Sequence, residues 1–175
     1  RCAADSLALE SGDTVVELGC GTGANFELLR ERVGPTGRII GVDLTDRMLE
    51  QARARVERKG WDNVELVLSD AAAYEFPQGG NGILESLALP LCREYDEVVA
   101  RGARALAPGG RWVSLDLQEP EDAPEWLIRA AMPLVRPYGV TRELAERSIW
   151  ESIRRHLPNY RPRWHSDTRL RLGGS

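Results

Sequence analysis

The segment over residues 14–26 constrains the fold of this chain more than any other feature. A short apolar run, TVVEL, leads into glycines at three alternate positions, Gly19, Gly21 and Gly23. A run rich in β-branched residues that ends at glycine predicts a buried strand, and apolar residues at helical spacing predict a helix over 24–33. Glycines permit a tight turn and let a ligand approach the main chain, and the helix N-terminus offers free N–H groups. The segment therefore predicts a strand, a ligand-binding turn and a helix.

Short apolar runs and amphipathic segments alternate along the chain as far as residue 118. This pattern predicts helices over 46–60 and 93–106, a loop over 75–82, a turn over 107–110, and strands over 39–42, 64–68, 83–89 and 111–117. Helical crossovers between apolar strands imply an α/β fold with a mostly parallel, doubly wound sheet and helices on both faces. Ligands bind such sheets outside the carboxyl ends of the strands.

The pattern changes after residue 118. A polar, proline-bearing connector precedes helices predicted over 125–135 and 141–157. The second of these fits a lid or a lipid-contacting helix, and it equally fits an ordinary docking helix. Residues 160–172 have too little pattern to decide between final strands and irregular chain.

Acidic residues stand at the ends of three successive predicted strands, namely Glu17, Asp43 and Asp70. A carboxylate beside the glycine turn would repel a pyrophosphate, but it suits a ligand with an ammonium group and a sulfonium centre. Asp43 can accept hydrogen bonds from both hydroxyls of a ribose, and Asp70 from the amino group of adenine. Together they describe a site for S-adenosylmethionine. The structural alternatives are that Asp43 only precedes a Thr45 cap and that Asp70 only caps a short helix over 71–75.

Four segments, VVELGCGTG, IIGVDLTDRMLEQAR, LVLSDAA and LAPGGRWVSLDL, resemble the class I S-adenosylmethionine-dependent methyltransferases in order and spacing. The resemblance spans residues 12–118. Within the class, the sequence is most similar to the ubiquinone/menaquinone C-methyltransferases and the bacterial phospholipid N-methyltransferases. The resemblance implies a Rossmann-like sheet of seven strands and S-adenosylhomocysteine as the product of the cofactor.

The resemblance also implies a cofactor-binding role for individual residues. The methionine part of the cofactor would be held by the glycine motif, Glu17, Gly19, Gly21 and Gly23. The ribose and adenine would be held by Asp43, Leu44, Met48, Asp70 and Ala71, and Leu87 would pass near the methyl group. No catalytic residue is assigned.

The acceptor side is less well marked. Aromatic faces could bind a methylated ammonium, although each candidate also fits core packing or a helix cap; the candidates are Tyr74, Trp126, Tyr138, Trp150 and His156. Glu85 could face the acceptor or lie at a solvated edge. We expect one domain over residues 1–175, with a cofactor-binding core over 1–118 and acceptor-side helices and last strands over 119–175.

The expected function is methyl transfer to a small or lipid-like acceptor, either a phospholipid amine or a quinone-type ring. The alternatives are a nicotinamide-dependent oxidoreductase, because Gly19, Gly21 and Ala24 fit a loose dinucleotide fingerprint, and a non-catalytic cofactor-binding relative. Residues 1–125 carry a net charge of −10 and residues 126–175 a net charge of +6. This asymmetry suggests peripheral contact with an anionic membrane, whereas the acidic body argues against nucleic acid as a partner.

Three widely spaced cysteines and two histidines predict neither a metal site nor a disulfide framework, and they favour a cytoplasmic location. The N-terminus has no secretory signal pattern, and no apolar run is long enough to span a membrane. Family members usually carry a longer N-terminal helical segment than the dozen residues here, so we expect part of that segment to be missing from this sequence.

Overall fold

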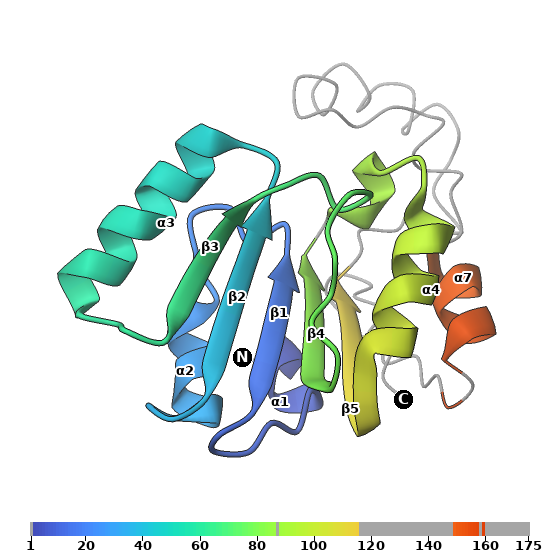
Figure 1. The fold of residues 1–175 in the computed structure, drawn as a ribbon, viewed down its shortest axis with the longest axis horizontal. Coiled ribbons are helices and arrows are strands. Elements are labelled where there is room, and N and C mark those ends of the chain that lie inside the picture. Colours follow the sequence, from blue (N-terminus) through green and yellow to red (C-terminus); the bar gives the residue numbers. More distant parts are fainter. Residues whose placement is uncertain (1, 87, 116–148, 158, 160–175) are drawn as a thin grey trace, which may run out of the picture.

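The computed structural model of the chain describes residues 2–86, 88–115, 149–157 and 159, which form a sheet covered by helices (Figure 1). In chain order the elements are α1 (Cys2–Ser6), β1 (Thr14–Leu18), α2 (Phe26–Val33), β2 (Arg38–Asp43), α3 (Asp46–Lys59), β3 (Val64–Leu68), β4 (Gly80–Ser86), the short 3-10 helix η1 (Leu89–Leu91), α4 (Tyr95–Ala105), β5 (Leu106–Leu115) and α7 (Ile149–His156).

The five described strands form one sheet in the order β3-β2-β1-β4-β5, and all of their pairings are parallel. The chain runs outward from β1 through β2 to β3 and then returns to β4 on the other side of β1. The strand order therefore reverses at β1, which is the switch point where open α/β sheets bind ligands. The predicted doubly wound fold class is confirmed for these residues, and the further strands of a seven-stranded sheet would lie outside them.

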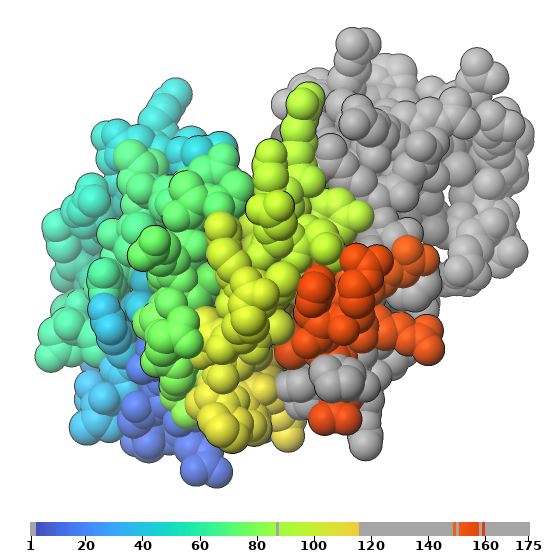
Figure 2. Space-filling model, turned by 45° about the vertical axis from the view of Figure 1, so that its right-hand side comes forward, coloured from blue at the N-terminus to red at the C-terminus, as the bar shows by residue number. Residues whose placement is uncertain are grey.

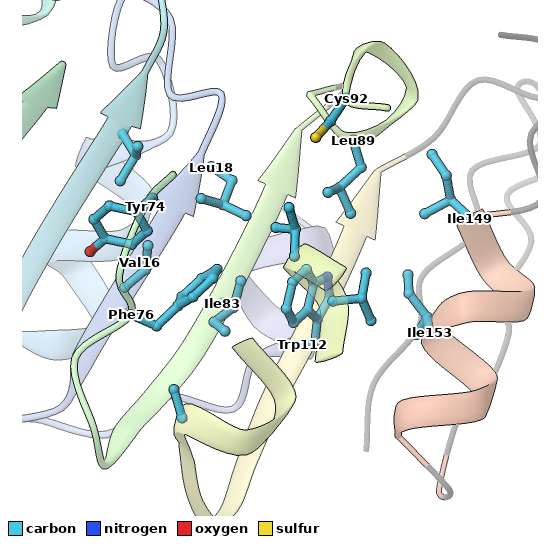
Figure 3. Packing of buried hydrophobic residues seen from close by; sticks show 14 of the residues in the cluster. Val16, Leu18, Tyr74, Phe76, Ile83, Leu89, Cys92, Trp112, Ile149 and Ile153 are labelled. Carbon is cyan, nitrogen blue, oxygen red and sulfur yellow. The ribbon is translucent and has the colours of Figure 1, made fainter. Parts of the chain in front are cut away.

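Helices cover both faces of the sheet because successive strand residues point to opposite sides. In β1, Val15 belongs to the core layer beneath α1, α2 and α3, whereas Val16 and Leu18 belong to the layer beneath α4 and α7. Figure 3 shows this second layer, which includes Trp112 of β5, Ile149 and Ile153. The Trp112 ring lies against Gly102 of α4. A fully buried tryptophan and the aliphatic residues around it fix the spacing between sheet and helices.

The largest differences from the predicted elements lie in β4 and β5. β4 begins at Gly80, inside the predicted loop, because Gly80 pairs with Leu106. The predicted turn over 107–110 lies within β5, as an irregularity between the Gly80–Leu106 pair and the Gly82–Arg111 pair. β4 also ends at Ser86 instead of residue 89, since η1 follows it.

The described part of the helix predicted over 141–157 is α7, which packs on α4 (Figures 1 and 2). Ile149 and Ile153 form its buried side, and Leu157, directly after the helix, is buried as well. This packing is that of a docking helix. The helix predicted over 125–135 and the segment 160–172 lie outside the described residues. Among the helices that the structure describes, none is both long and apolar enough to cross a lipid bilayer.

Candidate functional site

The candidate site lies at the carboxyl edge of the sheet, where β1, β2 and β3 end side by side. Leu18 pairs with Val42, and Asp43 pairs with Leu68, so these strands end at nearly the same level. This register brings Glu17 and Asp43 to neighbouring strand ends and places Asp70 just beyond the next one.

The glycine turn after β1 folds back against the end of β2. The N–H groups of Gly19 and Cys20 donate to the Val42 carbonyl at 2.9 and 3.1 Å, and the Gly21 N–H donates to Asp43 Oδ2 at 2.8 Å. Helix α2 begins only at Phe26, because the turn continues through residue 25. The three glycines are thus part of one compact turn attached to β2.

Two of these glycines serve different purposes. Gly19 has a φ of +68°, and a Cβ there would come within 2.6 Å of the Ala88 Cβ, so the close approach of the two loops requires glycine. Gly21 has a φ of +53°, and a Cβ there would have no neighbour within 4 Å. Gly21 therefore borders open space where a ligand can approach the main chain.

Glu17 is a buried acid on the α2 side of β1. Its Oε1 accepts a hydrogen bond from Asn25 Nδ2 at 2.7 Å, while its Oε2 is buried and accepts no well-formed hydrogen bond from the described residues. Burial raises the pKa of this carboxyl group to about 8; the hydrogen-bonding effects of Asn25 and Ser86 oppose that rise, and the nearby Asp43 charge adds to it. An unsatisfied acceptor beside a glycine turn suits a cationic group on a ligand.

Asp43 connects the glycine turn with the start of α3 through two hydrogen bonds. Its Oδ2 accepts from Gly21 N–H, and its Oδ1 accepts from Thr45 N–H at 2.8 Å. Thr45 is the residue before α3, but its side chain makes no capping hydrogen bond. Since each carboxylate oxygen can accept more than one hydrogen bond, Asp43 can still receive ligand hydroxyl groups.

The remaining predicted cofactor residues surround this edge, with one exception. Leu44 and Met48 are 68% and 41% exposed, so their apolar side chains are accessible at this edge. Asp70 is exposed, and its Oδ1 accepts from Ala72 N–H at 2.9 Å in a turn over 71–73, where no helix forms. Ala71 follows it and is half-buried. Leu87 lies outside the described residues.

Sequence reasoning missed two polar residues next to Glu17. Asn25 Nδ2 contacts Ser86 Oγ at 3.3 Å in addition to Glu17 Oε1, so the ends of β1 and β4 and the start of α2 share one polar network. Ser86 directly follows a charged residue within an otherwise apolar strand, and this break in pattern was the available signal. Asn25 gives no distinct signal in the sequence, because it lies inside the helix predicted over 24–33.

Glu85 is fully buried, so the alternative of a solvated edge residue is wrong, and facing the acceptor remains the untested alternative. Its Oε1 accepts from the N–H groups of Ala88 and Leu89 at 2.6 and 3.0 Å, and its Oε2 accepts from Ser114 Oγ. These contacts fix the start of η1 and join β4 to β5. They give Glu85 a structural role on the face of the sheet opposite Glu17.

Two acceptor-side candidates have structural partners. The Tyr74 ring is buried, with its centroid 5.1 Å from that of Phe76 in an edge-to-face arrangement, as core packing predicts. His156 Nε2 lies 3.3 Å from Asp96 Oδ1, at the junction of α7 and α4. The side chain of Trp150 and the whole of Trp126 and Tyr138 lie outside the described residues.

Comparison with known proteins points to one family. Residues 15–110 match the model of the methyltransferase domain. A 2-phytyl-1,4-naphtoquinone methyltransferase of Thermosynechococcus vestitus is 33% identical over 160 residues, which cover 87% of this chain and 69% of that protein. A demethylmenaquinone methyltransferase of Lactococcus lactis is 33% identical over 111 residues, 63% of this chain and 44% of that protein.

Solved structures agree with the sequence comparison at the level of the fold. A putative methyltransferase of Bacillus halodurans superposes with a TM-score of 0.71 at 21% identity, over 93% of this chain and 69% of the other. The share of each relative that the chain spans varies widely, from 69% of the first curated relative to 44% of the second.

Proposed function

The chain belongs to the S-adenosylmethionine-dependent methyltransferases, and from this premise we propose that it methylates a quinone-type ring. Similarity to two relatives named for naphthoquinone and menaquinone substrates supports this acceptor class. Because the chain belongs to this family, the alternative function of a nicotinamide-dependent oxidoreductase is not pursued. A phospholipid amine remains the competing acceptor and is an arm of the test below.

The single observation that carries the cofactor assignment is the unsatisfied, buried Glu17 Oε2 at the end of the strand that leads into the glycine turn. These residues fit S-adenosylmethionine, because a buried acceptor at that place requires a donor and the ligand carries an ammonium group. When bound, the cofactor supplies an activated methyl group on a sulfonium sulfur.

The residues of the chain have separate binding roles in this proposal. Glu17 accepts from the ammonium group, and Asp43 accepts from the ribose hydroxyls while it holds the glycine turn. Leu44 and Met48 cover the adenine with apolar surface, and Asp70 accepts from its amino group. By holding the cofactor at these points, the protein contributes orientation and exclusion of water, which are its main means of accelerating a displacement at carbon.

The acceptor can be tested by incubating the full chain with S-adenosylmethionine labelled at the methyl group. One arm contains a reduced naphthoquinone with an unsubstituted ring position, and the other contains vesicles of phosphatidylethanolamine. We expect label in the quinone and none in the lipid. Label only in the lipid would contradict the acceptor assignment, and turnover of neither acceptor would favour a cofactor-binding relative without this activity.

A further inference from the structure

An arginine of α4 reaches across to the turn that follows β3. Arg101 Nη2 lies 3.1 Å from the Ala71 carbonyl oxygen and 2.6 Å from the Ala72 carbonyl oxygen, and donates to both. The side chain is half-buried, and its Nε is buried without a hydrogen-bond partner among the described residues. A guanidinium group is always charged, so its burial against carbonyls carries a desolvation cost.

Among the described residues, no other group donates a hydrogen bond to the carbonyls of Ala71 and Ala72. The N–H groups of this turn are used internally, since Ala72 N–H donates to Asp70 Oδ1, and Ala73 and Tyr74 N–H groups donate to the Asp70 carbonyl. Arg101 therefore holds the carbonyl groups of the turn, while Asp70 accepts hydrogen bonds from its N–H groups. Arg101 is thus a polar link between α4 and the turn that carries Asp70 and Ala71, in addition to the packing of Ala71 and Ala72 on the apolar core.

We propose that Arg101 is a positioning residue for cofactor recognition, holding the turn at Asp70 and Ala71 in the form that accepts adenine. This inference rests on the proposed function, because it takes Asp70 as the partner of the adenine amino group. It predicts that Arg101 affects the discrimination between bases more than the general affinity for the ligand.

The test compares two ligands by calorimetric titration of the full chain. One is S-adenosylhomocysteine, and the other is S-inosylhomocysteine, in which a carbonyl oxygen replaces the amino group of adenine. We expect the wild-type chain to prefer the adenosyl ligand by about tenfold or more, which is the size expected for a hydrogen bond to a charged acceptor. In Arg101→Met, the Kd of the adenosyl ligand rises while that of the inosyl ligand changes little, so the preference falls to about threefold or less.

Two further variants separate positioning from general damage. Arg104→Met removes an exposed arginine from the same helix and leaves both Kd values unchanged. Arg101→Lys keeps a charged donor and retains an intermediate preference. If Arg101→Met fails to fold, the test rests on Arg101→Lys. A preference of this variant for the adenosyl ligand that is smaller than that of the wild type supports the proposal, and a preference equal to that of the wild type overturns it.

The remaining outcomes distinguish this proposal from the proposed function. An unchanged preference in folded Arg101→Met, or an equal rise of both Kd values, overturns the positioning role and leaves the methyltransferase assignment intact. Equal binding of both ligands by the wild-type chain also overturns the positioning role, because Asp70 would then not accept a hydrogen bond from the adenine amino group. Wild-type chain that binds neither ligand overturns the cofactor site itself.

Discussion

At the scale of single residues, the proposed role of Glu17 depends on the protonation of its buried carboxyl group. Burial raises the pKa of its carboxyl group from 4.5 to about 8, so the group is largely neutral at pH 7 without a ligand. A cationic group placed against Oε2 would favour the ionised form. Both the stability of the chain and its affinity for the cofactor should therefore depend on the titration of Glu17.

The free energy of unfolding of the ligand-free chain should fall as the pH rises, because of Glu17. Between pH 4.5 and about 8 the folded state retains a proton that the unfolded state has lost, so raising the pH favours unfolding. The slope is on the order of 1 kcal/mol per pH unit. In Glu17→Gln this contribution disappears. Urea denaturation of both chains at pH 5.5 and pH 7.5 measures the difference, and parallel changes in the two chains would contradict the raised pKa.

Cofactor affinity should show the opposite trend. Because binding of an ammonium group requires ionised Glu17, binding releases a proton, and the affinity for S-adenosylhomocysteine rises between about pH 6 and 8. The gain approaches tenfold per pH unit well below the pKa. Titrations in buffers of different ionisation enthalpy detect the released proton. An affinity that does not change with pH would show that Glu17 does not contact the cation.

Asp43→Ala should weaken S-adenosylhomocysteine binding by about 100-fold or more, since two hydrogen bonds to a charged acceptor are worth roughly 1.5–3 kcal/mol each. The variant also releases the Gly21 N–H from its partner. Asp46→Ala, which removes an exposed acid from the first turn of α3, is the control and should bind normally. If a folded Asp43→Ala chain bound S-adenosylhomocysteine as tightly as the wild type, Asp43 would not be a ligand of the ribose.

At the scale of elements, α4 connects the sheet with α7 and with the turn after β3. Its close approach to the sheet depends on Gly102, where a Cβ would come 2.3 Å from a ring atom of Trp112. Gly102→Ala should therefore lower the free energy of unfolding by about 1–3 kcal/mol, despite the better helix propensity of alanine. Arg104→Ala on the exposed side should change it little. Equal stability of wild type and Gly102→Ala in urea would mean that α4 can move away from Trp112 at no cost.

Asp96 on α4 holds α7 through several donors. Its Oδ1 accepts from Ser152 Oγ at 2.6 Å and from Arg155 Nη1 at 2.9 Å, and His156 lies beside them. The Ser152 hydrogen bond is the main cause that lowers the pKa of Asp96. The stabilisation is therefore present at neutral pH and is lost as the pH falls below about 4.

Removing this acceptor should loosen α7 without unfolding the sheet. The Asp96 side chain is 46% exposed, so Asp96→Ala should cost about 1 kcal/mol or less. Amide hydrogen exchange at pH 7 should become faster in α7 and stay unchanged in β1. Glu97→Ala, at an exposed acid of the same helix, is the matched control. Unchanged exchange in α7 would mean that its apolar side alone holds it.

At the scale of the whole molecule, the sequence predicted what depends on local pattern. Runs such as TVVEL placed the central strand at its observed bounds, and Asp43 at the end of an apolar run was placed at the correct edge. The start of β4 at Gly80 could not be predicted from the sequence, because its pairing with Leu106 is a tertiary contact and glycine has no strand preference. Arg101 was missed for the same reason, since its partners lie 29 and 30 residues away.

We propose that S-adenosylmethionine binds at the carboxyl edge of this sheet. Calorimetric titration of the chain with S-adenosylhomocysteine at pH 8, with NADH as a parallel control, tests this proposal. We predict one site per chain with a Kd in the micromolar range for the first ligand and no binding of the second. Folded chain that binds no S-adenosylhomocysteine, or that binds NADH in its place, would contradict this account.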